Sequence, residues 1–335
     1  MMKSMTETEI HIRGFVIMPK VSVVIPAYNT MNYLPKTLES VLQQTFTDFE
    51  VLIINDGSSD HIVEWASELI DPRVKLISQE NQGLPGARNT GIAHAQGEYI
   101  AFLDGDDLWK STKLEMQVNC LNSQPEVGLV YTWSALVDEQ DNPTGRIFVS
   151  HAEGDVWQQL FEADVIANGS SAMVRRCCFE TVGVFDRSLT SAEDLDMWLR
   201  IAAHYPFAVV KEPLTLYRQH PDSMSKNYQR MFKTLRTVFE KAFQSVPLEQ
   251  LYLRNRAYAN MFLGLAWLAI DKGDYKKAID FRKQALLHQP QIGFSQRCLR
   301  LSFAIAMMRW FGPHAYDGVR SLTRTLRQRI LGVSP

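Results

Sequence analysis

Residues 98–109 read EYIAFLDGDDLW, and this stretch decides the fold. An unbroken apolar run at 99–103 leads directly into an acidic turn at 104–107. Such a run is typical of a strand that is buried on both faces, as in a parallel sheet. The stretch therefore predicts a buried strand with a cluster of carboxylates at its carboxyl end.

The residues before this stretch alternate between apolar runs and helical periodicity. Strands are expected at 21–27, 50–54, 74–78 and 98–103, and helices at 33–42, 59–70 and 85–95. Asn32, and Ser58 or Ser59, are the expected N-caps of the first two helices. This alternation predicts an α/β fold, with a Rossmann-like, mainly parallel sheet flanked by helices.

The rest of the chain changes character twice. Up to residue 218 the pattern is mixed, and after about Lys226 it is purely helical. Strands are expected at 128–137, 207–210 and 215–218, and helices at 156–163 and 192–203. We therefore expect an N-terminal extension at 1–19, an α/β domain at 20–225 and a helical C-terminal region at 226–335.

Within the helical region, residues 266–290 resemble one tetratricopeptide-type helix pair, with Gly273 between the helices and Pro290 at the end. One copy cannot stack into a solenoid. Two interpretations stay open: a helical hairpin docked on the α/β domain, or a degenerate repeat that binds a partner.

The last part of the chain, from residue 291, carries seven arginines and one aspartate, a net charge of +6, with Leu, Phe and Trp between them. This pattern suits the headgroup region of an anionic membrane. Alternatively, the apolar face packs on the α/β domain and the arginines are only solvated. The membrane interpretation predicts peripheral contact at the inner face of the membrane.

Composition excludes several classes of protein. The chain has 335 residues, 46% of them hydrophobic, and a formal net charge of −2, so a global field that captures nucleic acid is not expected. No stretch reaches the ~18 uncharged apolar residues of a membrane span, and the N-terminus lacks a secretory signal pattern. The four cysteines form no CxxC pair, which predicts reduced thiols in a cytoplasmic protein.

Acidic residues follow two of the predicted parallel strands, where ligands bind in open α/β sheets. Asp56 either stabilises its own turn or accepts the imide N–H of a uracil-type base. The carboxylates of Asp104, Asp106 and Asp107 repel one another unless a cation or solvent separates them. Mg²⁺ or Mn²⁺ would bind such oxygens together with substrate phosphates, whereas the alternative is a solvated acidic turn.

Two further signals lie outside these turns. Glu193 and Asp194 precede an apolar-periodic helix, where they either compensate the helix dipole or supply a general base. Arg88 lies between glycines in the segment NQGLPGARNTG at 81–91. It either contacts a nucleotide or pairs with one of the strand-end aspartates, and both roles are compatible.

These motifs resemble the inverting glycosyltransferases of family 2, which have the GT-A fold. The matching segments, in order, are VSVVIPAYNT, FEVLIINDGSSD, NQGLPGARNTGI, YIAFLDGDDLW, VGVFDRSLTSAEDLDMWLRI and LYRQHPDSMS. They lie between residues 21 and 225. The resemblance implies transfer of a sugar, with inversion, from a nucleotide diphosphate donor such as a UDP-sugar. It also implies an acceptor that is a saccharide or lipid-linked saccharide, in cell-surface polysaccharide or glycolipid synthesis.

The resemblance also implies residue roles. The nucleotide pocket would comprise Pro26, Ala27, Tyr28, Asp56, Arg88 and Asp104, with Tyr28 stacked on the base. Asp106, with Asp107 and His220, would hold Mn²⁺ or Mg²⁺, and Asp194 would be the catalytic base. One position departs from the family, where two aspartates often precede Gly57 and this chain has Asn55 first. The hydrogen bonds around the base are then expected to differ.

Two other classes of function compete with this one. A catalytically silent binding module would have no need of a base at Asp194. A nucleotidyltransferase would be expected to carry a glycine-rich, basic loop after the first strand, and residues 28–31 read YNTM. Both alternatives are therefore less well supported than a transferase.

Overall fold

The computed structural model describes residues 18–162, 165–220, 228–244 and 246–312, together with residues 316 and 318. The strands are β1 Val21–Ala27, β2 Phe49–Asp56, β3 Val74–Gln79, β4 Tyr99–Phe102, β5 Leu108–Trp109, β6 Leu129–Val137, β7 Pro143–Phe148, β8 Ala172–Arg175 and β9 Phe207–Arg218. The helices of the α/β part are α1 Leu34–Leu42, α2 Ile62–Ser67, α3 Gly83–His94, α4 Lys113–Ser123, α5 Gln159–Glu162, α6 Arg176–Val182 and α7 Glu193–Ala202.

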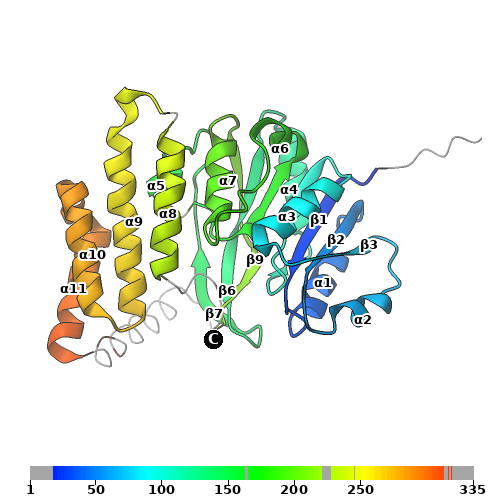
Figure 1. Ribbon diagram of the computed structural model, residues 1–335, viewed down its shortest axis with the longest axis horizontal. Helices are drawn as coiled ribbons and strands as arrows, with labels where there is room; N and C mark the ends of the chain where they lie inside the picture. The colour runs from blue at the N-terminus through cyan, green and yellow to red at the C-terminus, as the bar shows by residue number, and fades with distance from the viewer. Residues whose placement is uncertain are drawn as a thin grey trace, which may run out of the picture.

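These strands form one sheet in the order β3-β2-β1-β4-β8-β6-β9-β5, and β7 pairs with β6 (Figure 1). The four strands β3, β2, β1 and β4 run parallel to one another, as the sequence predicts. The second half is mixed, because β8 runs antiparallel to both β4 and β6 while β6 and β9 are parallel. The sheet is therefore parallel around β1 and mixed beyond β4.

Both faces of the sheet are covered by helices. Val23 and Ile25 of β1 pack in a core that includes residues of α1 and α4, whereas Val24 packs in a second core that includes residues of α3 and α7. Alternate side chains of a strand point to opposite faces, so a strand covered on both faces is apolar at nearly every position. This explains the apolar run VSVVIPA. The exception in β1 is Ser22, whose hydroxyl donates a 2.8 Å hydrogen bond to Glu50.

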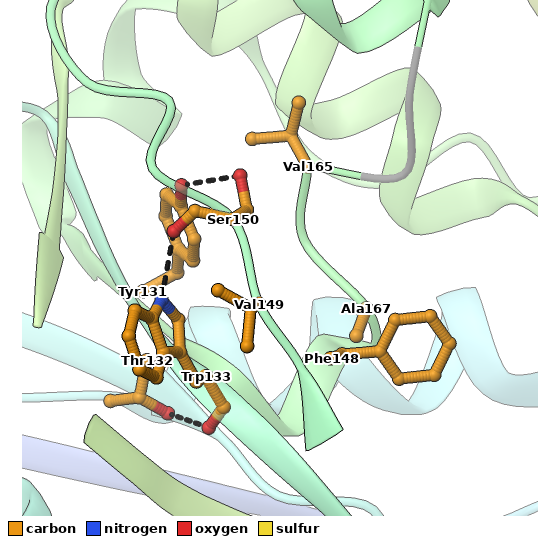
Figure 2. A pocket seen from close by; sticks show the side chains of 8 residues that line it. All are labelled: Tyr131, Thr132, Trp133, Phe148, Val149, Ser150, Val165 and Ala167. Atoms are coloured by element: carbon orange, nitrogen blue, oxygen red, sulfur yellow. Dashed lines mark hydrogen bonds between the residues drawn. The ribbon is translucent and has the colours of Figure 1, made fainter. Parts of the chain in front are cut away.

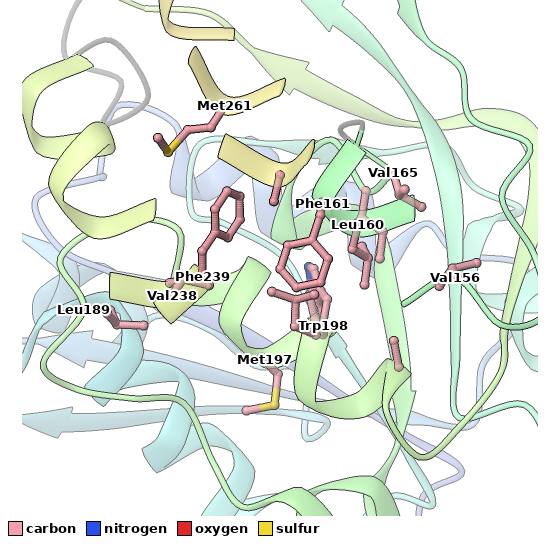
Figure 3. Close-up of a cluster of buried hydrophobic side chains, with 14 of the residues drawn as sticks. Val156, Leu160, Phe161, Val165, Leu189, Met197, Trp198, Val238, Phe239 and Met261 are labelled. Carbon is pink, nitrogen blue, oxygen red and sulfur yellow. The ribbon is translucent and has the colours of Figure 1, made fainter. Parts of the chain in front are cut away.

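The helical C-terminal region comprises α8 Tyr228–Phe243, α9 Tyr252–Asp271, α10 Tyr275–His288 and α11 Gln296–Phe311. It shares the α3–α7 core with the sheet. Figure 3 shows Phe161 of α5 beside Phe239 of α8, above Trp198 of α7; the Phe161 and Phe239 ring centroids are 5.3 Å apart. Lys241 of α8 adds ion pairs of 2.8 Å to Asp186 and 2.9 Å to Asp196 of α7. The region is therefore joined to the α/β part through α5 and α7.

The segment 266–290 contains the end of α9 and all of α10, so two helices are present there, and the first of them begins earlier, at Tyr252. Gly273 between them has φ +76°, a conformation that glycine adopts without strain. Asp274 caps α10 by accepting a hydrogen bond of 3.0 Å from the amide of Lys277. Pro290 begins a short 3₁₀ turn directly after α10.

Other predicted boundaries were wrong. The helix expected at 59–70 is shorter and comprises only α2, Ile62–Ser67. Ser58 and Ser59 do not cap it, because the amide of Ser58 bonds Asn55 and the amide of Ser59 bonds Asn29 in the preceding turn. The two strands expected at 207–218 are one strand, β9, with a register shift against β6. None of α4, α6, β7 and β8 was expected.

Candidate active site

The parallel half of the sheet brings the predicted nucleotide-pocket residues to one edge. Strand β1 lies between β2 and β4, and Ala27 pairs with Asn55 of β2. The carboxyl ends of these strands therefore place Tyr28, Asp56 and Asp104 in neighbouring loops. This is the edge where open α/β sheets bind ligands.

Asp56 is a buried carboxylate with one oxygen in use. Its Oδ1 accepts hydrogen bonds of 2.6 Å from Nε2 of Gln79 and 2.9 Å from the amide of Gln82. Among the described residues, Oδ2 has no protein donor. Tyr28, at the end of β1, is 54% exposed. A buried acceptor beside an exposed ring has the chemistry to bind a planar base.

Asn55, where the sequence departs from the family, has a structural role. Its Oδ1 accepts a 2.9 Å hydrogen bond from the amide of Ser58, and its Nδ2 donates to Oγ of Ser78 at 3.2 Å. The amide therefore closes the turn after β2 and joins it to β3.

Arg88 joins two carboxylates from distant parts of the chain. Its Nη2 donates to Asp104 at 2.7 Å and its Nη1 to Glu193 at 2.8 Å. Burial alone would lower the pKa of Arg88, but Asp104 and Glu193 outweigh it and raise the pKa further. A cation fixed in this way aligns the end of β4 with the start of α7. The ion pairs predicted for Arg88 with a strand-end aspartate are confirmed for Asp104.

Gly169 lets the guanidinium fit. A Cβ at this position would lie 2.6 Å from Nη2 of Arg88. Gly169 begins a short 3₁₀ turn, Gly169–Ser171, whose Ser170 hydroxyl accepts a 3.0 Å hydrogen bond from the amide of Asp104. The turn therefore supports Arg88 and Asp104 together, and the sequence analysis missed it.

Asp106 and His220 meet at this edge although they are 114 positions apart in the chain. Nε2 of His220 lies 2.8 Å from Oδ2 of Asp106, and its ring stacks on Tyr33 with centroids 5.5 Å apart. Arg218, buried at the end of β9, donates from Nε to the carbonyl of Asp106 at 2.6 Å. Its guanidinium also lies 4.8 Å from the centroid of the Tyr33 ring. The end of β9 thus holds the acidic loop.

Asp107 differs from Asp106 in its surroundings. It is fully buried, and its two oxygens accept hydrogen bonds of 2.6 Å from Oγ of Ser170 and 2.9 Å from the amide of Arg218. Burial, together with Asp106 and Asp104, raises the pKa of Asp107 well above its usual value. These contacts favour a structural role over the metal-ligand role that the sequence predicts.

Glu193 and Asp194 form the first turn of α7. The preceding residue, Ala192, is left-handed with φ +51°, a conformation that costs a non-glycine residue about 1–2 kcal/mol. Glu193 points to Arg88 and is buried, whereas Asp194 is partly exposed. Burial raises the pKa of Asp104, Arg88 opposes this shift, and the charges of Asp106 and Asp194 add to it. Burial raises the pKa of Glu193 to about 7, although Arg88 opposes the shift. Asp194 is therefore the more accessible carboxylate of the pair.

A cavity of about 10 Å³ lies between β6 and the segment that leads into the Gly169 turn. Figure 2 shows Trp133 of β6, Phe148 at the end of β7 and Ala167 around it. The indole of Trp133 is fixed by a 2.8 Å hydrogen bond to the carbonyl of Ser150. Ala167 precedes the Gly169 turn by two residues, so the pocket borders the support of Arg88.

Comparison with known proteins agrees with this geometry. Residues 22–183 match the family model described as "Glycosyl transferase family 2". A Bacillus subtilis protein named "Putative glycosyltransferase EpsH" is 30% identical over 233 residues, which cover 66% of this chain and 67% of that protein. This chain belongs to glycosyltransferase family 2. The chain spans only 29% to 61% of the length of the five Rickettsia proteins that it matches, each named as an uncharacterized glycosyltransferase.

Two solved structures share the GT-A fold of this glycosyltransferase. The mannosyltransferase PcManGT of Pyrobaculum calidifontis, in complex with GDP-Man and Mn²⁺, has a TM-score of 0.59 and 20% identity, over 95% of this chain and 89% of that one. S. aureus TarS 1–349 in complex with UDP-GlcNAc has a TM-score of 0.55 and 16% identity, over 81% and 92%. None of the described helices combines the length and apolarity needed to cross a membrane.

Proposed function

We propose that this glycosyltransferase moves a sugar from a nucleotide diphosphate donor to an acceptor hydroxyl with inversion at the anomeric carbon. The observation that carries the proposal is the meeting of three groups at one sheet edge. These groups are the Asp56 acceptor, the Asp104–Arg88–Glu193 ion pairs with Asp194 beside them, and the Asp106–His220 pair. Each group suits one part of the reaction.

The nucleotide would lie over the ends of β1 and β2. Oδ2 of Asp56 would accept an N–H of the base, and the exposed ring of Tyr28 would stack on it, with Pro26 and Ala27 as the floor. Stacking of a base on an aromatic ring is worth about 1–3 kcal/mol in single-strand binders. Asp104, held by Arg88, would face the ribose.

The Asp106–His220 pair fits a divalent cation that is shared with the substrate. The described residues contain no group of three His, Cys, Asp or Glu side chains that could hold a metal by themselves. Mg²⁺ and Mn²⁺ commonly take one or two protein ligands and complete their shells with water and substrate phosphates. When bound, such an ion would offset the charge that develops on the diphosphate leaving group. Asp107 would support the loop from behind.

Asp194 would remove the proton of the acceptor hydroxyl. It starts α7, it is partly exposed, and its neighbour Glu193 is fixed by Arg88. A base on the face opposite the leaving group leads to inversion in one displacement. The role of Glu193 would be to fix the first turn of the helix while Asp194 meets the acceptor.

The acceptor proposed here is a saccharide or a lipid-linked saccharide. The cavity of Figure 2, with a volume of about 10 Å³, has room for about one water molecule, so the acceptor would lie outside it, against the exposed surface next to Asp194. We also propose peripheral membrane contact through the basic tail that the sequence predicts from residue 291 onward. Of this tail the structure describes residues 291–312, 316 and 318.

The test is a panel of UDP- and GDP-sugars, assayed with Mn²⁺ for binding and for hydrolysis in the absence of an acceptor. One nucleotide sugar should bind and be hydrolysed slowly by the wild type. Asp194→Asn should bind the same donor with little change in affinity. If no nucleotide sugar binds with Mn²⁺ present, the proposal is wrong and a silent partner-binding role is favoured.

A further inference from the structure

The outer face of α11 carries exposed apolar side chains in a stripe. Leu299, Phe303 and Trp310 are 57%, 58% and 74% exposed, and Phe311 follows them at the helix end. At 100° per residue the first three fall within about 40° of one another on the helix surface. Figure 1 shows α11 as the outermost helix of the C-terminal region, far from β1–β3.

The opposite face of α11 is apolar as well. Leu301, Ile305 and Met308 are buried within the core that includes α9 and α10. A surface helix of a globular protein normally has one apolar face and one polar face. Since α11 is apolar on both, its outer stripe is expected to be covered by something other than water.

Positive charge borders the stripe on both sides. Arg300 and Arg309 lie about 100° and 80° from Leu299, in opposite directions around the helix. Both are exposed, and neither forms an ion pair with a described residue. Residues 281–312 contain no aspartate or glutamate at all. An apolar stripe between two arginines, in a segment without acids, is complementary to an anionic apolar boundary.

From this arrangement we propose that α11 binds the surface of an anionic lipid bilayer. Phe303 and Trp310 would enter the boundary between headgroups and acyl chains, and Arg300 and Arg309 would contact lipid phosphates. A second copy of this chain is a poorer occupant, because a twofold contact of α11 with itself would place like charges together. We define Leu299, Phe303, Trp310 and Phe311 with Arg300 and Arg309 as the α11 patch.

The patch has a consequence for the reaction, and this step alone rests on the proposed function. Figure 1 shows α11 ending on the side of the molecule where α8 begins, and α8 follows His220 in the chain. A membrane bound along the outer face of α11 would hold the enzyme at the bilayer surface. This placement suits an acceptor carried by a lipid.

Co-sedimentation with vesicles tests the α11 patch directly. Full-length protein is mixed at low salt with vesicles of phosphatidylcholine, with or without phosphatidylglycerol, and the bound fraction is measured. Binding is expected only with phosphatidylglycerol. Phe303→Gln/Trp310→Gln should weaken it at least about 10-fold, because the rings enter the boundary. The matched control Ile70→Gln, at an exposed apolar residue of the α/β part, should bind as the wild type does.

A second pair of variants tests the charge. Arg300→Gln/Arg309→Gln should weaken binding about 30-fold, from about 1 kcal/mol per arginine, whereas Arg300→Lys/Arg309→Lys should bind nearly as the wild type does. Circular dichroism and donor hydrolysis check that each variant is folded. Donor hydrolysis by a wild type that stays in the supernatant with anionic vesicles would overturn the lipid proposal and leave the proposed function standing. Dimerisation that is lost in Phe303→Gln/Trp310→Gln would also overturn it.

Discussion

The guanidinium of Arg88, on α3, donates a 2.8 Å hydrogen bond to Glu193, the residue directly before the proposed base. The two residues are 105 positions apart in the chain. The same guanidinium bonds Asp104 on the donor side, so one buried cation fixes the positions of both halves of the site. A base held in this way needs little reorganisation when the acceptor arrives.

The first prediction concerns Asp194. Asp194→Asn is nearly isosteric but accepts no proton at neutral pH, so turnover should fall at least ~10²-fold while donor affinity changes little. Steady-state rates and donor titration measure the two effects. Asp196→Asn is the matched control on the same helix, because Asp196 bonds Lys241 and Arg200. Asp196→Asn should lower the melting temperature, while its turnover should stay close to that of the wild type. Equal losses of donor affinity and turnover in Asp194→Asn would indicate that Asp194 is only a structural cap.

The second prediction concerns the metal. Asp106→Ala should abolish transfer and weaken Mn²⁺-dependent donor binding, because Asp106 pairs with His220, whereas the neighbouring Asp107 is buried and bonded to Ser170 and Arg218. Treatment with EDTA should have the same effect on the wild type. Asp48→Ala, at an exposed aspartate on the opposite edge of the sheet, is the control and should remain active. Near-normal turnover of Asp106→Ala, or of the EDTA-treated enzyme, would show that the metal assignment is wrong.

The third prediction concerns Gly169. Gly169→Ala places a methyl group 2.6 Å from Nη2 of Arg88, and the guanidinium cannot move aside without losing an ion pair. We expect a loss of roughly 1–3 kcal/mol in the free energy of unfolding, together with weaker donor binding. Urea denaturation and donor titration measure both quantities.

The control for this variant is Gly264→Ala in α9. The nearest contact of its Cβ would be an ordinary 3.5 Å to Nη2 of Arg297, and alanine favours the helix by about 1 kcal/mol. This variant should be as stable as the wild type or more stable. Wild-type stability and donor binding in Gly169→Ala would mean that Arg88 is not held as tightly as its two ion pairs indicate.

The parallel half of the sheet was predictable because its strands carry local signals. β1, β2 and β4 are buried on both faces, so each is an apolar run that ends in a turn. β7 is mostly exposed, and β8 has only four residues, so neither shows a pattern of its own. Such strands form because their neighbours in the sheet are already in place, and no short window of sequence reports that.

The residues of the candidate site also fall into two groups, those with a local sequence signal and those without one. Asp56, Asp104 and Asp106 could be proposed as site residues because they stand at the ends of strands, and that rule depends only on the local pattern. Arg218 was missed although it lies within the quoted segment LYRQHPDSMS. Its partner, the carbonyl of Asp106, is 112 residues away, and a buried arginine at a strand end looks like any solvated one in the sequence. The residues that carry reactive groups were therefore easier to predict from the sequence than the residues that hold them in position.

The last prediction concerns pH and Glu193. Burial raises the pKa of this carboxyl from 4.5 to about 7, with Arg88 opposing, so the folded protein binds a proton between these values that the unfolded chain releases. The resulting stabilisation is complete below about pH 4.5 and is lost as the pH rises through about 7. Glu193→Gln is neutral throughout and lacks this dependence. Relative to the variant, the wild type should therefore lose on the order of 3 kcal/mol of unfolding free energy between these limits. Urea denaturation of both proteins across this range measures the difference. Parallel curves would mean that Arg88 keeps Glu193 ionised, and that the ion pair outweighs burial at the base of α7.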